Sequence, residues 1–281
     1  MKKIILLFCL FAFAHSVYSQ TVGIRAGINF SSFDGPLEEG ESYSFNNGIH
    51  FGISYGYKFS PSIMLRAEML YSQKGTKQKY EGESYFLIYT PKKTVYENGY
   101  DTFNLQISNA YISLPLVVAF QASKKFEIYG GLSPSILINP TGRGTRDFIS
   151  KDHPDDILFR QSLVYNYSSD IPKGSSSASK NIRVRVNGEI IGINKIANAY
   201  YQTDFAPETY INAIDLSGVV GFNYFFNRGF FGGLRLEYGL MDVTSNKVDY
   251  SRADLNPDKT LILREDFDRN VDISLSLGFR F

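Results

Sequence analysis

The chain has 281 residues with nearly balanced charge, 29 basic against 28 acidic side chains. This balance gives no indication of a nucleic-acid partner, because such a partner favours a strongly basic surface. The only cysteine is Cys9, so disulfides are excluded. A content of 23 Phe, 20 Tyr and 24 Gly with no Trp favours β-structure with tight turns.

The N-terminus has the pattern of a secretory signal peptide. Lys2 and Lys3 are followed by an apolar run from Ile4 to Ala14 and by small residues ending at Ser19. We therefore predict a signal peptide over residues 1–19, cleaved after Ser19. No later stretch approaches the ~18 consecutive apolar residues of a transmembrane helix. An exported protein of this kind belongs to the periplasm, the medium or the outer membrane.

Eight segments alternate between apolar and polar residues, which predicts β-strands over 21–32, 48–59, 62–74, 110–121, 125–138, 213–226, 230–241 and 271–281. The last one is the clearest, because from Val271 to Phe281 every odd position is apolar and every even position is polar or glycine. Such a strand has one apolar and one polar face. In a soluble protein it would be an aggregation-prone edge. In a bacterial outer membrane it is the closing strand of a barrel.

The connections alternate between short and long. The short ones lie at 60–61, 122–124 and 227–229, and the long ones are expected over 33–47, 75–102, 139–208 and 242–267. Short periplasmic turns alternate with long outer loops in transmembrane barrels, whereas a secreted β-sandwich has no reason to sort its loops in this way. The predicted fold class is therefore all-β, an eight-stranded antiparallel transmembrane β-barrel over residues 20–281.

The connection over 139–208 is predicted to be a long extracellular loop with structure of its own. Asn187-Gly188 between two apolar runs indicates a hairpin, and the tract Ser175–Ser179 before it is expected to be flexible. The stretch from Ile157 to Tyr167 could form a further strand, which keeps a ten-stranded barrel open as an alternative. Pro115 and a change of apolar phase between Ile107 and Ile112 predict a β-bulge in the fourth strand.

Several motifs together resemble the outer-membrane β-barrel family that is common in Bacteroidetes and often labelled PorT-like. They are Gly23–Asn29, Tyr111–Leu116, Tyr129–Pro134, Glu237–Leu240 and Leu277–Phe281. The resemblance covers the strands and leaves out the loops over 75–102 and 139–208. It implies an eight-stranded outer-membrane barrel with no catalytic residue set and no cofactor. Some relatives serve protein secretion, so an accessory role in secretion or envelope assembly is the alternative function.

Nothing in the sequence indicates an enzyme, a cofactor site or a metal site. His50 falls on the inner face, where a hydrogen-bonded interior residue is expected. His153 lies within Asp152–Asp156, which could hold a cation, although a solvated loop is the favoured interpretation. No Ser-His-Asp spacing stands out.

The alternation predicts ten charged side chains inside the barrel, five of each sign. An eight-stranded barrel encloses only enough room for side chains, and buried charges must be paired, so we predict a structural charge network that plugs the lumen rather than an ion path. The predicted members are Arg25, Lys58, Arg66, Arg235 and Arg280 with Glu68, Glu127, Asp215, Glu237 and Asp272.

The expected function is a non-enzymatic outer-membrane protein whose large outer loops bind a partner or shield the surface. The loops are rich in tyrosine, which suits recognition surfaces, although packing of the loops onto one another is the simpler explanation. The expected partners are outer-membrane lipid and the barrel-assembly machinery, for which Phe279 and Phe281 are the predicted assembly signal. Other envelope or secretion proteins are partners only in the alternative role, and a small pore is less favoured.

Overall fold

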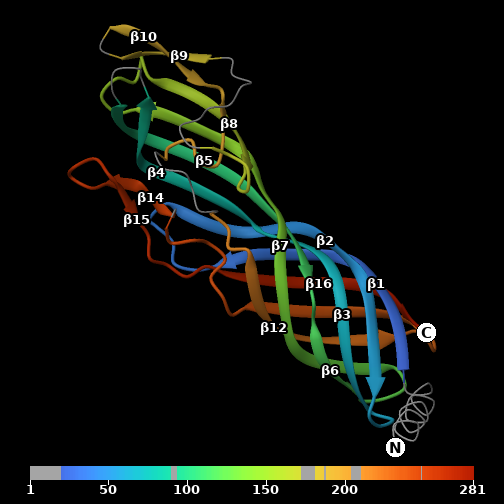
Figure 1. The fold of residues 1–281 in the computed structure, drawn as a ribbon. Helices are drawn as coiled ribbons and strands as arrows, with labels where there is room; N and C mark the ends of the chain where they lie inside the picture. Colours follow the sequence, from blue (N-terminus) through green and yellow to red (C-terminus); the bar gives the residue numbers. More distant parts are fainter. Residues whose placement is uncertain (1–19, 90–93, 172–180, 187, 204–209, 248) are drawn as a thin grey trace, which may run out of the picture.

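The computed structural model describes residues 20–89, 94–171, 181–186, 188–203, 210–247 and 249–281 (Figure 1). The predicted signal peptide, the Ser175–Ser179 tract and Asn187 lie outside these residues. The described part of the chain forms sixteen strands. No helix in it is long and apolar enough to span a membrane.

Eight strands close into an antiparallel barrel in the lower part of Figure 1. The ring closes where β16 pairs with β1, from Gly23 opposite Arg280 to Asp34 opposite Arg269. Its order is β1 (Gln20–Asp34), β2 (Glu41–Lys58), β3 (Ile63–Lys74), β6 (Leu116–Gln121), β7 (Phe126–Ser150), β12 (Ile214–Phe225), β13 (Phe230–Gly239) and β16 (Arg269–Arg280).

Two further strands belong to the same ring. β4 (Thr76–Tyr89) continues β3 beyond Gly75, and β5 (Thr94–Ser113) leads into β6 past Leu114 and Pro115. The ring therefore contains ten named strands among the described residues, but β3 with β4 and β5 with β6 each occupy one position around it. The predicted eight-stranded barrel is confirmed.

The stretch from Ile157 to Tyr167 does form a strand, but not a barrel strand. β8 (Leu158–Asn166) pairs with the upper part of β7 on one side and with the two-residue β11 (Ile196–Ala197) on the other. It lies above the barrel, so the ten-stranded alternative that rested on it does not hold.

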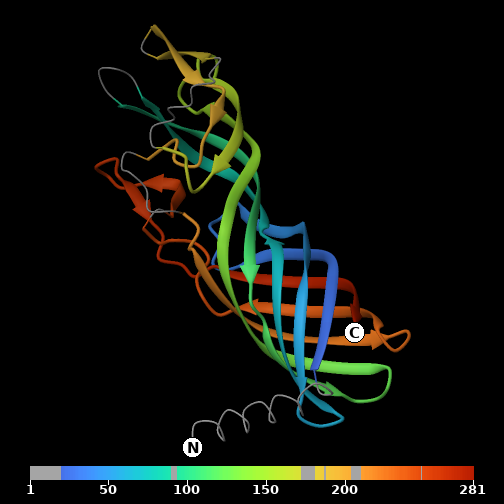
Figure 2. The same cartoon turned by 45° about the vertical axis from the view of Figure 1, so that its right-hand side comes forward.

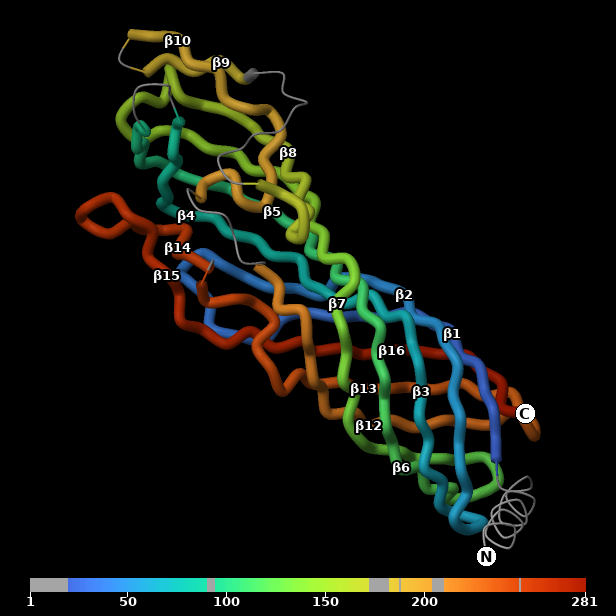
Figure 3. The backbone as a smooth tube through the Cα atoms, viewed as in Figure 1, coloured from blue at the N-terminus to red at the C-terminus, as the bar shows by residue number. Residues whose placement is uncertain are grey.

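Above the barrel the sheet continues into an elongated lobe, which we call the outer head and define as the described residues of 76–107, 140–203 and 242–268 (Figures 2 and 3). β7 has 25 residues, about 80 Å at 3.3 Å per residue, whereas a membrane crossing needs about 9–11. Two small hairpins complete the head: β9 (Asn181–Val186) with β10 (Glu189–Asn194), and β14 (Tyr250–Leu255) with β15 (Leu261–Leu263).

The prediction of loops over 75–102 and 139–208 was therefore wrong for much of their length, because β4, β5, β7 and β8 run through them. The physical reason is that the apolar face changes sides above the barrel. In the head the inward residues form an apolar core that includes Phe86, Phe148 and Ile157, all fully buried. In the barrel the outward residues are apolar and exposed, as Ile53, Leu116 and Leu277 are.

This change of sides explains the apolar phase change that we attributed to a bulge in the fourth strand. β5 keeps its odd residues inward throughout, and Ile107 is buried in the head core while Ile112 faces outward lower down. A bulge does occur at this height, but on the neighbouring strand: Ala110 pairs with Asn139 and Tyr111 with Leu137, so Ile138 of β7 is the extra residue.

Candidate functional site

The barrel lumen collects most of the charged side chains that the alternation placed there. Eight of the ten are no more than 6 % exposed, and only two are more open: the Arg280 side chain at 15 % and Lys58, which is exposed at the short-turn end. The eight buried residues are Arg25, Arg66, Glu68, Glu127, Asp215, Arg235, Glu237 and Asp272.

The lower half of the lumen holds an alternating series of ion pairs. Glu127 pairs with Arg280 through one carboxylate oxygen and with Arg66 through the other, the second at 2.6 Å. Arg66 continues to Glu68 through its Nε atom at 2.8 Å. These contacts join β16, β7 and β3 across the interior. Arg66 and Glu68 lie two residues apart on β3, so both side chains face the lumen.

The series continues upward without a break. Glu68 Oε2 lies 2.5 Å from Arg235, Arg235 lies 3.5 Å from Glu237, and Glu237 pairs with Lys74 at 2.6 Å. Seven charges of alternating sign thus run along the lumen from the lower rim to the top of β3. We call this series the charge ladder: Arg280, Glu127, Arg66, Glu68, Arg235, Glu237 and Lys74.

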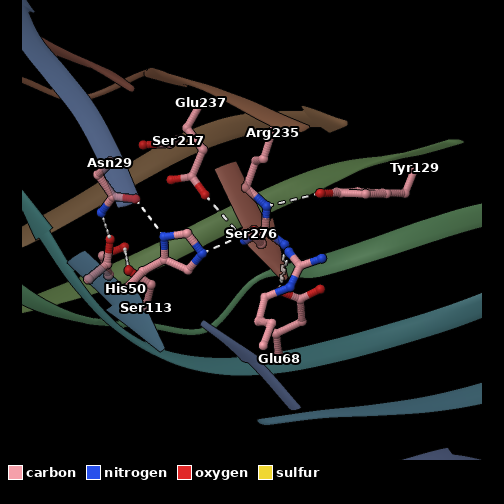
Figure 4. A network of polar contacts seen from close by, with 12 residues as sticks. Asn29, His50, Glu68, Ser113, Tyr129, Ser217, Arg235, Glu237 and Ser276 are labelled. Carbon is pink, nitrogen blue, oxygen red and sulfur yellow. Dashed lines mark hydrogen bonds and ion pairs between the residues drawn. The ribbon is translucent and has the colours of Figure 1, made fainter. Parts of the chain in front are cut away.

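Aromatic and amide groups fill the space beside the charge ladder (Figure 4). Three guanidinium groups lie near the Tyr129 ring, with Arg66 4.5 Å, Arg235 5.4 Å and Arg25 5.9 Å from the ring centroid, which is close enough for cation–π attraction. Arg25 pairs with Glu68 at 3.5 Å and donates to Asn223 at 3.3 Å. Glu68 therefore contacts three arginines.

Lys74 is a buried lumen charge that was not among the ten predicted members, whereas Lys58, which was among them, lies exposed at the rim. Both lie on inward-facing positions, but Lys58 ends β2 at the rim, where its side chain reaches solvent. Lys74 ends β3 at the upper end of the charge ladder, where it pairs with Glu237, and it is 2 % exposed. With Lys74 counted in place of Lys58, the lumen holds five cations and five carboxylates. Asp215 and Asp272 are among these carboxylates and are buried near the upper end.

His50 takes part in a neutral hydrogen-bond chain beside the ladder (Figure 4). Asn29 donates its amide to the Gln73 carbonyl at 2.8 Å, which leaves its amide oxygen free to accept. His50 Nδ1 therefore donates to that oxygen at 2.7 Å, and Nε2 accepts from the Ser276 hydroxyl at 3.0 Å. Both ring nitrogens are used, which agrees with the expected interior role.

Outside the lumen the structure brings three carboxylates together that the sequence analysis did not single out. Asp249, Asp266 and Asp268 each place one oxygen within 4.8 Å of the other two. Burial raises the pKa of Asp249 to about 8 and that of Asp268 to about 7, with the Asp266 carboxylate adding to both shifts. His153, in the segment considered for a cation, instead lies 3.3 Å from Glu97, with its side chain 54 % exposed.

Comparison with known proteins agrees with this architecture. The family described as outer membrane protein beta-barrel domain matches residues 18–245. A search of curated proteins finds no match.

Among solved structures, the chain is similar to Ail, the attachment invasion locus protein of Yersinia pestis, at 12% identity and a TM-score of 0.37, over 94% of this chain and 99% of that one. Neisserial surface protein A matches at 11% identity and 0.38, over 92% and 97%. OprG from Pseudomonas aeruginosa matches at 10% identity and 0.35, over 94% and 96%. With the family match over most of its length and a closed eight-stranded ring, the chain belongs to the outer-membrane β-barrel domain family and resides in the bacterial outer membrane.

Proposed function

We propose that this protein is a non-enzymatic barrel whose lumen is closed by the charge ladder and whose outer head binds a partner or shields the cell surface. The observation that carries the proposal is the continuity of β5, of β7 and of β3 with β4 from the barrel into the head. A head built on wall strands, with an apolar core of its own, is held in a fixed position above the membrane. The quoted sequence motifs support a place within the PorT-like branch from Bacteroidetes.

The part of the head between the β4–β5 and β14–β15 hairpins offers a surface suited to binding. A cavity of about 250 Å³ lies between the β4–β5 hairpin and β15, lined by Leu87, Tyr96, Leu261 and Leu263 among others. Tyr96 and Tyr100 are 39 % and 44 % exposed, whereas most of the other aromatics of the outer segments pack inside. Exposed tyrosine beside an apolar cavity is typical of recognition surfaces.

Site-specific cross-linking tests where partners bind. Thr260→Cys places a single thiol on the β14–β15 turn of the head, beside this cavity, and Ser123→Cys places one at a short turn of the other rim; both residues are exposed. A membrane-impermeant maleimide on intact cells should label Thr260→Cys alone. Cross-linked partners should likewise appear with Thr260→Cys. Adducts confined to Ser123→Cys, with secretion or envelope proteins in them, would favour the accessory role instead.

We expect the purified protein to pass almost no current in a planar lipid bilayer. Eight strands leave an interior that side chains fill, and in this lumen the charge ladder occupies it with paired ions. Single-channel recording of the wild type checks this. Large and steady conductance steps would contradict the closed lumen and favour a pore.

We expect removal of the chain's terminal aromatic pair to reduce assembly. The Phe281 N–H donates to the Val22 carbonyl at 2.8 Å, and the Phe281 ring packs 4.9 Å from Phe279 on the outward face. Phe279→Ser with Phe281→Ser should lower the fraction that migrates as a folded barrel on unboiled gels, because the closing strand loses its lipid-facing end. Phe45→Ser, at an exposed position near the opposite rim, is the control. Normal insertion of the double variant would remove the assembly signal from our proposal.

A further inference from the structure

The last outer segment leaves the barrel after β13 and returns to it at β16. Between these points it carries the β14–β15 hairpin. Asp249 lies directly before β14, and Asp266 and Asp268 lie directly before β16. The two ends of the excursion therefore meet at three carboxylates, with one oxygen of each within 4.8 Å of the others.

These three carboxylates are largely shielded from solvent. Asp249 is 5 % exposed, Asp268 is fully buried, and the Asp266 side chain is 7 % exposed. Arg264 pairs with Asp266 at 2.6 Å but also with Glu41 at 3.0 Å, so the cluster shares this guanidinium with a fourth carboxylate. Arg252 is a second positive charge that acts on Asp249. Burying carboxylates this close together is unfavourable unless cations or a proton compensate them.

The hydrogen bonding of the cluster is an independent indication that a cation binds there. Asp268 Oδ2 accepts from the Thr244 hydroxyl at 3.1 Å, but its Oδ1 is buried and receives no donor. Neither oxygen of Asp266 receives a well-aligned hydrogen bond, although Arg264 lies close. Buried carboxylate oxygens without donors are rare in proteins, and a bound ion is one of the arrangements that satisfies them.

We propose that Asp249, Asp266 and Asp268 bind a divalent cation, with calcium preferred over magnesium. Carboxylate oxygens are the ligands that hard cations prefer. Three protein carboxylates around one ion suit calcium, which takes about six to eight oxygen ligands in a flexible geometry, whereas magnesium keeps several waters and is usually bound by one or two carboxylates. Backbone carbonyls and water would complete the coordination shell.

Such an ion would link two segments of the chain that are distant in sequence. It joins the start of β14 to the start of β16 and so holds the hairpin down on the barrel rim. Because an ion that binds only the folded segment stabilises it by mass action, adding calcium should slow proteolysis within 249–268 and raise the temperature at which this segment opens.

Terbium luminescence tests the site directly. Tb³⁺ substitutes for calcium, and the chain has no Trp, so energy transfer must come from tyrosine. The Tyr210 hydroxyl lies 3.5 Å from Asp249 Oδ1 and is the expected sensitiser. The full-length protein, folded in detergent and treated with chelator, should give saturable emission that calcium displaces at least tenfold more effectively than magnesium. Tyr210→Phe should dim the emission, while calcium binding measured by calorimetry stays unchanged.

Asp268→Asn should weaken calcium binding at least tenfold, as should Asp249→Asn. The matched control is Asp258→Asn on the same hairpin, where the carboxylate is exposed and bonds to Thr260. Gel mobility before and after boiling shows whether each variant is folded. The proposal is overturned if the folded wild type binds no calcium, or if Asp258→Asn weakens binding as much as Asp268→Asn does. The wild-type measurement decides the question even if a variant fails to fold.

Discussion

Glu68→Ala is expected to lower the free energy of unfolding of the barrel by about 3–5 kcal/mol. The Glu68 side chain is fully buried and contacts three arginines: Arg235 at 2.5 Å, Arg66 at 2.8 Å and Arg25 at 3.5 Å. Its removal leaves three guanidinium groups close together without the carboxylate that separates them. The charge ladder would break at its centre, between the strand pairs that it braces.

The measurement is the denaturant midpoint for the loss of the heat-modifiable band in lipid vesicles. Lys79→Ala is the matched control, because Lys79 pairs with Glu81 at 2.7 Å but both side chains are about half exposed. An exposed pair of this kind contributes about 0–1 kcal/mol. If Glu68→Ala shifts the midpoint no further than Lys79→Ala, the charge ladder does not stabilise the barrel and the lumen charges are individually hydrated.

The barrel could be predicted because lipid imposes one strict requirement on each wall strand. Val271 to Phe281 must place every other residue in hydrocarbon, and no neighbouring element can relieve that requirement. The alternation in the sequence is therefore as regular as the strand itself, and the structure pairs this segment with β1 and β13 as the closing strand should pair.

The outer head could not be recognised in the same way, because water replaces lipid there. Outside the membrane, the positions of a strand that face inward change from polar to apolar, because they now pack into the core of the head. Along β5 the inward positions are apolar at Phe103, Leu105 and Ile107, and polar at Asn109 and Ser113. A pattern that inverts within one strand looks like the end of that strand, so the sequence pattern predicts a loop there.

The sequence predicts which charged side chains face the lumen, but not how far along the barrel each of them lies. Alternation places Lys58 and Lys74 on the same inner face, yet only the register of β2 and β3 shows that Lys58 reaches the rim while Lys74 meets Glu237. Pairs on one strand, such as Arg66 with Glu68, are readable from spacing. Cross-lumen pairs and the Asp249–Asp266–Asp268 cluster depend on tertiary structure, and no local spacing indicates them.

Phe86→Ala should open the outer head while leaving the barrel intact. Phe86 is fully buried, and its ring lies 4.7 Å from that of Phe159 and 5.6 Å from that of Phe148, with the Arg146 guanidinium 4.9 Å from its centroid. Truncating a buried phenylalanine to alanine costs about 3–5 kcal/mol. The cost falls on the head, because its apolar cluster is separate from the small cluster inside the barrel.

Two measurements on the same cells separate the two regions. Added protease should cut within the described residues of 76–107 or 140–203 in Phe86→Ala, and the remaining barrel should still shift on gels when boiled, because its wall pairs and charge ladder do not involve Phe86. Tyr96→Ala, at an exposed position on the same hairpin, should change little, since surface substitutions are usually within about 0.5 kcal/mol. If Phe86→Ala instead prevents insertion altogether, the continuous strands β4, β5 and β7 couple head and barrel into one folding unit, and the head is then part of what closes the barrel rather than a platform that it carries.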